Sequence, residues 1–144
     1  MKYPLVQNYL GGQFVPSTCE TAPVISPLDG SQLSQVPHSG AAEVAAAVSA
    51  AKAAFPAWAA QTLRQRAAVM YRYRELLVQN TAELAERIHA ENGKTLEEAR
   101  AEIVRGIEVT EFACSLPQIA AGEVLEVSPG VECRVDRVPL GVVA

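Results

Sequence analysis

The tripeptide Gly93-Lys94-Thr95 is the first feature of the sequence that could do chemistry. Gly-Lys-Thr ends many phosphate-binding loops, in which backbone N–H groups and the lysine surround a phosphate. Such a loop needs another glycine five residues before its Gly-Lys pair, and it follows a strand. The position here is Ile88, inside a helical pattern. The nucleotide-loop interpretation therefore fails.

The same three residues fit a corner between two helices. Gly93 can end the preceding helix in a left-handed conformation, which glycine adopts more readily than other residues. Thr95 can cap the following helix, and Glu98, three residues later, completes a capping box. We therefore interpret the tripeptide as structural, with Lys94 between the two helix ends.

Arg105 lies on the helix after this corner, which is expected over residues 96–116. Apolar spacing predicts a buried stripe of Leu96, Ala99, Ile103, Ile107, Thr110 and Cys114. A second line changes from acidic to apolar along the helix: Glu98, Glu102, Arg105, Val109, Phe112 and Leu116. Arg105 stands at that change. Spacing also allows it an ordinary ion pair with Glu102 or Glu108, three residues away on either side.

The remaining polar residues predict no metal or nucleophilic centre. Cys19, Cys114 and Cys133 are widely spaced and lack a C-x-x-C pattern, which favours free structural thiols. His89 has no second ligand nearby. The second helix carries four arginines that could form a basic patch, but a net charge of -4 favours a solvated or ion-paired face over nucleic-acid binding. The four arginines of the second helix are Arg64, Arg66, Arg72 and Arg74.

Length and composition are those of one globular domain. The chain has 144 residues, of which 49% are hydrophobic and 19% are charged. No apolar run approaches the roughly 18 residues that span a membrane. The first residues lack a signal-peptide pattern. We therefore expect a cytoplasmic protein without a membrane partner.

Helical spacing predicts three helices before the one that carries Arg105. The first covers residues 44–58, where Pro56 should end or distort it. The second covers residues 63–79, with a buried line of Val69, Met70, Tyr73, Leu76 and Leu77. The third begins at Asn80, which could cap it together with Glu83 in a capping box.

Short strands are expected at both ends of the chain. Residues 9–15 have two apolar arms around Gly-Gly and predict a hairpin. Residues 24–26 and 33–36 are further candidate strands. Residues 124–127 and 131–138 flank a Ser-Pro-Gly turn, and the second run alternates apolar and polar residues, which predicts a hairpin with one buried face.

The order of several segments resembles the N-terminal part of NAD-dependent aldehyde dehydrogenases. One segment resembles the coenzyme-A-acylating methylmalonate-semialdehyde dehydrogenase branch, namely "RGIEVTEFACS". The resemblance covers essentially the whole chain through "NYLGGQFV", "SPLDG", "AFPAW", "ENGKTLEEAR", "RGIEVTEFACSLP" and "VPLGVVA".

The resemblance implies an α/β fold: four helices, short N-terminal strands and a C-terminal hairpin, ending at the first strand of a Rossmann-type sheet. Residues 1–122 would be the helical part of the NAD-binding domain. Residues 123–138 would begin the oligomerisation element, which implies a homo-oligomer. Residues 139–144 would start the first strand of the sheet.

The resemblance also implies the chemistry. Arg105 matches an arginine that contacts the substrate carboxylate of a small aldehyde, here methylmalonate or malonate semialdehyde. NAD and coenzyme A are the cofactors of the full-length enzyme, and neither is expected on this chain. The catalytic cysteine, glutamate and asparagine all fall beyond residue 144, so the chain alone is expected to be inactive.

Three hypotheses follow from these observations. The chain is a segment of a longer enzyme, or a stand-alone structural or protein-interaction module derived from the family. The third and weakest is a nucleic-acid binder that uses the four arginines. Because truncation would leave apolar faces open, the isolated chain is also expected to self-associate.

Overall fold

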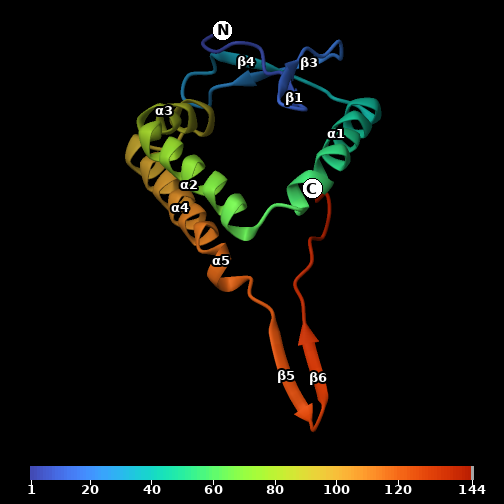
Figure 1. Cartoon of the computed structure of the whole chain (residues 1–144). Coiled ribbons are helices and arrows are strands. Elements are labelled where there is room, and N and C mark those ends of the chain that lie inside the picture. Colours follow the sequence, from blue (N-terminus) through green and yellow to red (C-terminus); the bar gives the residue numbers. More distant parts are fainter. Residues whose placement is uncertain (144) are drawn as a thin grey trace.

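The computed structural model describes residues 1–143, and in it the helices within residues 63–119 pack together, the helix at residues 41–59 stands apart from them, and two hairpins lie at one end and a third at the other (Figure 1). The strands are β1 (Asn8–Leu10), β2 (Gln13–Val15), β3 (Thr21–Ile25), β4 (Gln32–Pro37), β5 (Glu123–Ser128) and β6 (Val131–Val135). The helices are α1 (Ala41–Ala59), α2 (Leu63–Gln79), α3 (Thr81–Asn92), α4 (Leu96–Cys114) and α5 (Leu116–Ile119). The α/β class and the mixture of elements agree with the sequence analysis.

The strands form three separate antiparallel pairs: β1 with β2, β3 with β4, and β5 with β6. Gly11 and Gly12 both have positive φ, at 57° and 82°, and close the first hairpin as predicted. The N-terminal segment runs beside β4, where the Tyr3 N–H donates to the Leu33 carbonyl at 2.8 Å. No parallel pair occurs among residues 1–143.

The core lies where α3 and α4 pack together. Ala85 and Ala99 are fully buried and Ile103 is nearly so. Leu84, Ile88 and Ile107 pack around them. The alanines let the two helix backbones approach closely, so this core is small. Arg74 on α2 pairs with Glu111 on α4 at 2.8 Å and links the two helices at their exposed edge.

The corner between α3 and α4 has the predicted structure. Gly93 adopts the left-handed conformation with φ 82°, and its N–H donates to the His89 carbonyl. Thr95 Oγ1 accepts the Glu98 N–H at 3.2 Å, and Glu98 Oε2 accepts the Thr95 N–H at 3.0 Å. Lys94 Nζ reaches Glu102 Oε2 at 2.5 Å. The reciprocal cap and the ion pair set where α4 begins and in which direction it runs.

The N-terminal strands are fastened to this same corner. Ser26, which follows β3, donates from Oγ to the Ala90 carbonyl at 2.8 Å, and both residues are buried. A Cβ atom added to Gly93 would lie 3.0 Å from Cγ of Pro27. The close approach of this loop and the positive φ both favour glycine at position 93.

The two faces of α4 differ as the sequence pattern predicts. Ala99, Ile103, Thr110 and Cys114 are buried on the predicted stripe. On the second line, Val109 is 71% exposed and Phe112 is 67% exposed. Both large side chains therefore face outward.

The expectation for the Asn80 cap is wrong, and of the two effects expected of Pro56, an end or a distortion of the helix, the end does not occur. Pro56 does not end α1, which continues to Ala59. Proline lacks only one N–H, and near a helix end the loss of that single bond is tolerated. Asn80 does not cap α3 with its side chain; Nδ2 instead donates back to the Leu76 carbonyl at 2.7 Å. Because Asn80 ends α2 as well as preceding α3, the end of α2 takes its side chain.

The number of helices and the burial of α2 also differ from expectation. The fourth helix ends at Cys114 rather than Leu116, and a short fifth helix, α5, follows Ser115. On α2 only Ala67 is buried, whereas Tyr73 and Leu76 on the predicted line are half exposed. The fully buried position of α2 is thus held by a small residue, and the larger side chains of the predicted line remain partly or half exposed.

The C-terminal region forms the predicted hairpin but not its predicted burial. Every residue of β5 and β6 is exposed, and the hairpin extends away from the helices (Figure 1). Alternation predicts an apolar face without showing what covers it. Residues 139–143 form no strand, in contrast to the expected first strand of a sheet. A strand needs a paired neighbour, and none lies beside this run within residues 1–143. The last residue of the expected strand, at position 144, lies outside the described residues.

We predict that Gly93→Ala destabilises the chain by about 1–2 kcal/mol, because alanine is strained at positive φ. Gly106, inside α4, is the matched control, since an added Cβ there meets nothing within 4 Å. Gly106→Ala should stabilise the chain by about 0.5–1 kcal/mol. Urea unfolding followed by circular dichroism measures both values. Equal effects of the two substitutions would contradict the corner.

A second prediction concerns pH. The hydrogen bond from the Thr95 side chain, followed by that from its backbone N–H, lowers the pKa of Glu98 below the ordinary value of 4.5. A lowered folded-state pKa contributes stability that is present above pH 4.5 and is lost as pH falls through the folded pKa. Glu98→Gln should reduce the fall of the unfolding free energy with falling pH, and Glu97→Gln should leave this pH dependence unchanged. An unchanged profile in Glu98→Gln would count against the cap.

Candidate functional site

Arg105 lies on the exposed side of α4, nearly three turns beyond the helix corner. It lines a hollow of about 540 Å³ together with Lys94, Glu98, Ala101 and Glu102. The caps and the ion pair of the corner hold the other polar members of the hollow in place. Arg105 thus lies on the helix expected to carry it, beside acidic residues, and its contact with a substrate carboxylate stays a prediction.

The guanidinium of Arg105 forms no ion pair with any residue in the range 1–143. Glu102, one of its two expected partners, is held by Lys94 at 2.5 Å instead. Glu108, the other, makes no ion pair with it either. The local pairing that spacing allowed is not formed, and the planar donor groups of Arg105 remain available for a carboxylate.

The setting of Arg105 changes character along the helix. Toward the corner, the Thr95 hydrogen bonds lower the pKa of Glu98 and favour its charged form. Toward the other end lie the exposed apolar side chains of Val109 and Phe112. An arginine between acidic and apolar surroundings suits a small molecule with a carboxylate at one end and a less polar group at the other.

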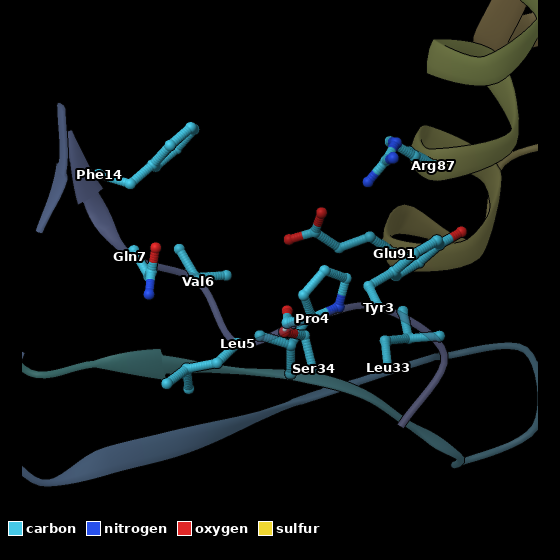
Figure 2. Close-up of a pocket in the computed structure, with 11 residues that line it drawn as sticks. Tyr3, Pro4, Leu5, Val6, Gln7, Phe14, Leu33, Ser34, Arg87 and Glu91 are labelled. Carbon is cyan, nitrogen blue, oxygen red and sulfur yellow. Dashed lines mark hydrogen bonds between the residues drawn. The ribbon is translucent and has the colours of Figure 1, made fainter. Parts of the chain in front are cut away.

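A second hollow, of about 530 Å³, lies between the N-terminal segment, the β3–β4 hairpin and α3. Figure 2 shows Arg87 and Glu91 entering it from α3, with Tyr3 beside them and Phe14 on the opposite side. Arg87 lies over the Tyr3 ring at 5.0 Å and pairs with Glu83 at 2.6 Å. These contacts hold the N-terminal segment against α3. Sequence reasoning missed this hollow because its walls come from distant parts of the chain.

A third and smaller hollow brings together two arginines that the sequence did not connect. Arg66, in the first turns of α2, and Arg137, after β6, line a space of about 240 Å³. Arg66 belonged to the four arginines predicted to be solvated or ion-paired. Of those four, only Arg74 forms ion pairs, with Glu111 and Glu75. No sequence spacing links Arg66 to Arg137.

The three cysteines are not paired with one another, and none of them lines the hollows at Arg105, Arg87 or Arg66. Cys19 donates from Sγ to Glu43 Oε1 at 3.1 Å, and this bond is the largest cause of the lowered pKa of Glu43. Cys114 is buried in α4 and Cys133 is exposed on β6. All three are free thiols, as predicted. Within the described residues no group of three potential ligands could hold a metal ion, and His89 instead contacts the Lys94 carbonyl.

The described residues do not fit a dinucleotide. Such cofactors bind in a crevice at the carboxyl ends of parallel strands, where a glycine-rich turn leads into a helix. All strand pairs within residues 1–143 are antiparallel. The positive φ of Gly93 serves the helix corner, and the element that leads into it is a helix, α3, not a strand. None of the described helices is long and apolar enough to cross a membrane.

Comparison with known proteins places this arrangement in a family. The pattern of the "Aldehyde dehydrogenase family" matches residues 14–144. Malonate-semialdehyde dehydrogenase 2 from Geobacillus thermodenitrificans (strain NG80-2) is 42% identical over 141 residues, which are 96% of this chain and 29% of that protein. Malonate-semialdehyde dehydrogenase 2 from Bacillus cereus (strain ZK / E33L) is 40% identical over the same shares.

Solved structures give the same result. A protein from Sinorhizobium meliloti 1021, assigned as a methylmalonate-semialdehyde dehydrogenase and complexed with NAD, superimposes with a TM-score of 0.90 at 37% identity. The match covers 98% of this chain and 29% of that one. Methylmalonate-semialdehyde dehydrogenase from Oceanimonas doudoroffii gives 0.86 at 34% identity, over 90% of this chain and 27% of that one. The chain thus spans less than a third of its relatives' length, and it belongs to the aldehyde dehydrogenase family.

Proposed function

We propose that this chain is the N-terminal portion of an aldehyde dehydrogenase that oxidises malonate or methylmalonate semialdehyde to an acyl-CoA with NAD. Relatives that carry those substrate names support the substrate class. The observation that carries the proposal is the unpaired Arg105 at the acidic-to-apolar boundary of α4. In the complete enzyme Arg105 binds the carboxylate of the substrate through two parallel hydrogen bonds.

The rest of the enzyme supplies the reaction. The relative from Sinorhizobium meliloti is complexed with NAD, and the described residues here do not fit that group. NAD and coenzyme A therefore belong to the full-length protein, together with the nucleophile and the base. This chain contributes the helical part of the NAD-binding domain in residues 1–122, the start of the oligomerisation element in residues 123–138, and the first sheet residues from 139 onward.

The proposed assembly is a cytoplasmic homo-oligomer. The exposed hairpin of β5 and β6 supports this, because Leu125 and Val127 on one strand and Val131 and Val135 on the other are all more than half exposed. Apolar side chains gathered on one extended hairpin favour contact with other protein surface.

A stand-alone structural or interaction module is the alternative, and the same exposed hairpin favours it. The reading frame after position 144 separates the two. An uninterrupted continuation with a later cysteine motif supports the enzyme, and a stop codon in the native gene supports the module.

The chain alone is expected to show no NAD-dependent oxidation of malonate or methylmalonate semialdehyde. The reason is chemical: none of its three thiols lies beside a base and a cofactor crevice. NADH absorbance measured with purified chain tests this, with a complete family member as the positive control. Turnover that rises in proportion to the amount of purified chain would refute it.

In the longer enzyme, Arg105→Leu should raise the KM for carboxylated aldehydes by about tenfold or more, since it removes charge-assisted hydrogen bonds. The KM for uncharged aldehydes should change far less. Arg100, exposed on the same helix, is the matched control, and Arg100→Leu should leave both values near the parent's. Equal changes for the two aldehyde classes would remove the carboxylate role.

A further inference from the structure

We propose that Arg66 and Arg137 form a second binding site on this chain, for a carboxylate group that is either a small free acid or an acidic side chain. The two residues line the hollow of about 240 Å³ between α2, α5 and the segment after β6. Its complete lining is Leu63, Arg66, Leu116, Ala120, Arg137, Val138 and Pro139. This site is distinct from the hollow at Arg105 and does not rest on the proposed function.

Arg66 carries the first observation. Its Nε atom is buried and has no hydrogen-bond acceptor. Among the side chains of residues 1–143 it is the sole buried nitrogen or oxygen in that condition. Buried donors in folded proteins nearly always have an acceptor, because removing a donor from water without replacing its bond costs stability. The buried Nε therefore calls for an acceptor that these residues do not provide.

Arg137 carries the second observation. Its Nε donates to the Ala121 carbonyl at 3.3 Å, which attaches the side chain beside the end of α5. The guanidinium makes no ion pair within the described residues. Its terminal N–H groups are therefore available to a ligand while its stem is held.

The charge of the lining residues indicates that the missing acceptor is an anion. Two arginines line one small hollow, and its lining contains no acidic residue. Some arginines elsewhere are paired with a carboxylate, as with Arg74 and Glu111 at 2.8 Å and Arg87 and Glu83 at 2.6 Å. An anion between Arg66 and Arg137 would relieve their repulsion and supply the acceptor for Nε.

The walls favour a carboxylate over phosphate. Besides the two arginines, all the residues that line the hollow are apolar. A carboxylate is attached to a hydrocarbon group that can contact such walls, whereas inorganic phosphate is more strongly hydrated and has no apolar part. Guanidinium groups match the carboxylate through parallel hydrogen bonds, and apolar surroundings strengthen the attraction.

The test is a titration of the ¹⁵N-labelled chain with two probes, followed by the Nε–Hε signals of the arginines in NMR. Malonate represents a free acid, and N-acetyl-aspartate amide represents an acidic side chain. We expect the signals of Arg66 and Arg137 to move together and to saturate with at least one probe. Arg64, exposed on the same helix and outside the hollow, should not follow them. The tighter of the two probes identifies the source of the carboxylate.

Variants make the result decisive. Arg66→Gln and Arg137→Gln should each weaken binding by about tenfold or more, the usual effect of losing a charge-assisted hydrogen bond. Arg64→Gln and Arg105→Leu should leave it unchanged, which separates this site from the one at Arg105. If Arg66→Gln fails to fold by circular dichroism, Arg137→Gln carries the test, because position 137 lies outside every helix and strand. Three results would overturn the proposal. The first is that neither probe gives a saturable shift, and the second is that the Arg66 signal in Arg137→Gln shifts as much as in the parent chain. The third is that phosphate binds more tightly than both probes.

Discussion

The turn at Gly93 determines the direction of α4, and α4 determines where its polar and apolar side chains lie. A left-handed residue ends α3, and a reciprocal hydrogen-bonded pair begins α4 only two residues later. Such a short connection leaves little freedom in the angle between the helices. The loop after β3 packs on the same point through Ser26 and Pro27. One corner therefore joins the strands, α3 and α4, and the small alanine core packs just behind it.

This corner also decides the state of Arg105. Lys94 is part of the turn, and from there it reaches Glu102. That contact occupies the carboxylate that would otherwise be the nearest partner of Arg105 on the helix. A purely structural ion pair thus leaves a guanidinium unpaired one turn away. The same residues that resemble a phosphate loop in sequence contribute to a possible substrate site by a different physical route.

Sequence reasoning succeeds where the deciding interactions are local. The glycine end, the Thr95–Glu98 box and the stripe of α4 all depend on residues within a few positions, so their spacing predicted them. It fails at Asn80 because two helix ends compete for one side chain. It also cannot foresee burial: alternation in β5 and β6 shows an apolar face, whereas its exposure depends on what lies beside it.

The candidate site divides along the same line. The position of Arg105 follows from helical spacing, but the loss of Glu102, one of its two expected partners, depends on Lys94 in the turn. The meeting of Arg66 and Arg137 depends on tertiary structure alone, since one residue begins α2 and the other follows β6. The family resemblance supplied a role for Arg105 and none for this pair.

The distribution of charge along the chain, rather than its net charge, explains why Arg105, Arg66 and Arg137 lack ion pairs. The chain has 16 acidic residues and 12 Lys or Arg residues, so carboxylates are not scarce. Several of them are engaged in caps and pairs: Glu98 closes a helix start, Glu102 holds Lys94, and Glu83 holds Arg87. An acidic chain can thus leave particular guanidinium groups without a partner, because helix geometry places its carboxylates elsewhere. The lack of an ion pair at Arg105, Arg66 and Arg137 therefore reflects where the carboxylates lie and not a shortage of them; what sets Arg66 apart is its buried Nε without an acceptor.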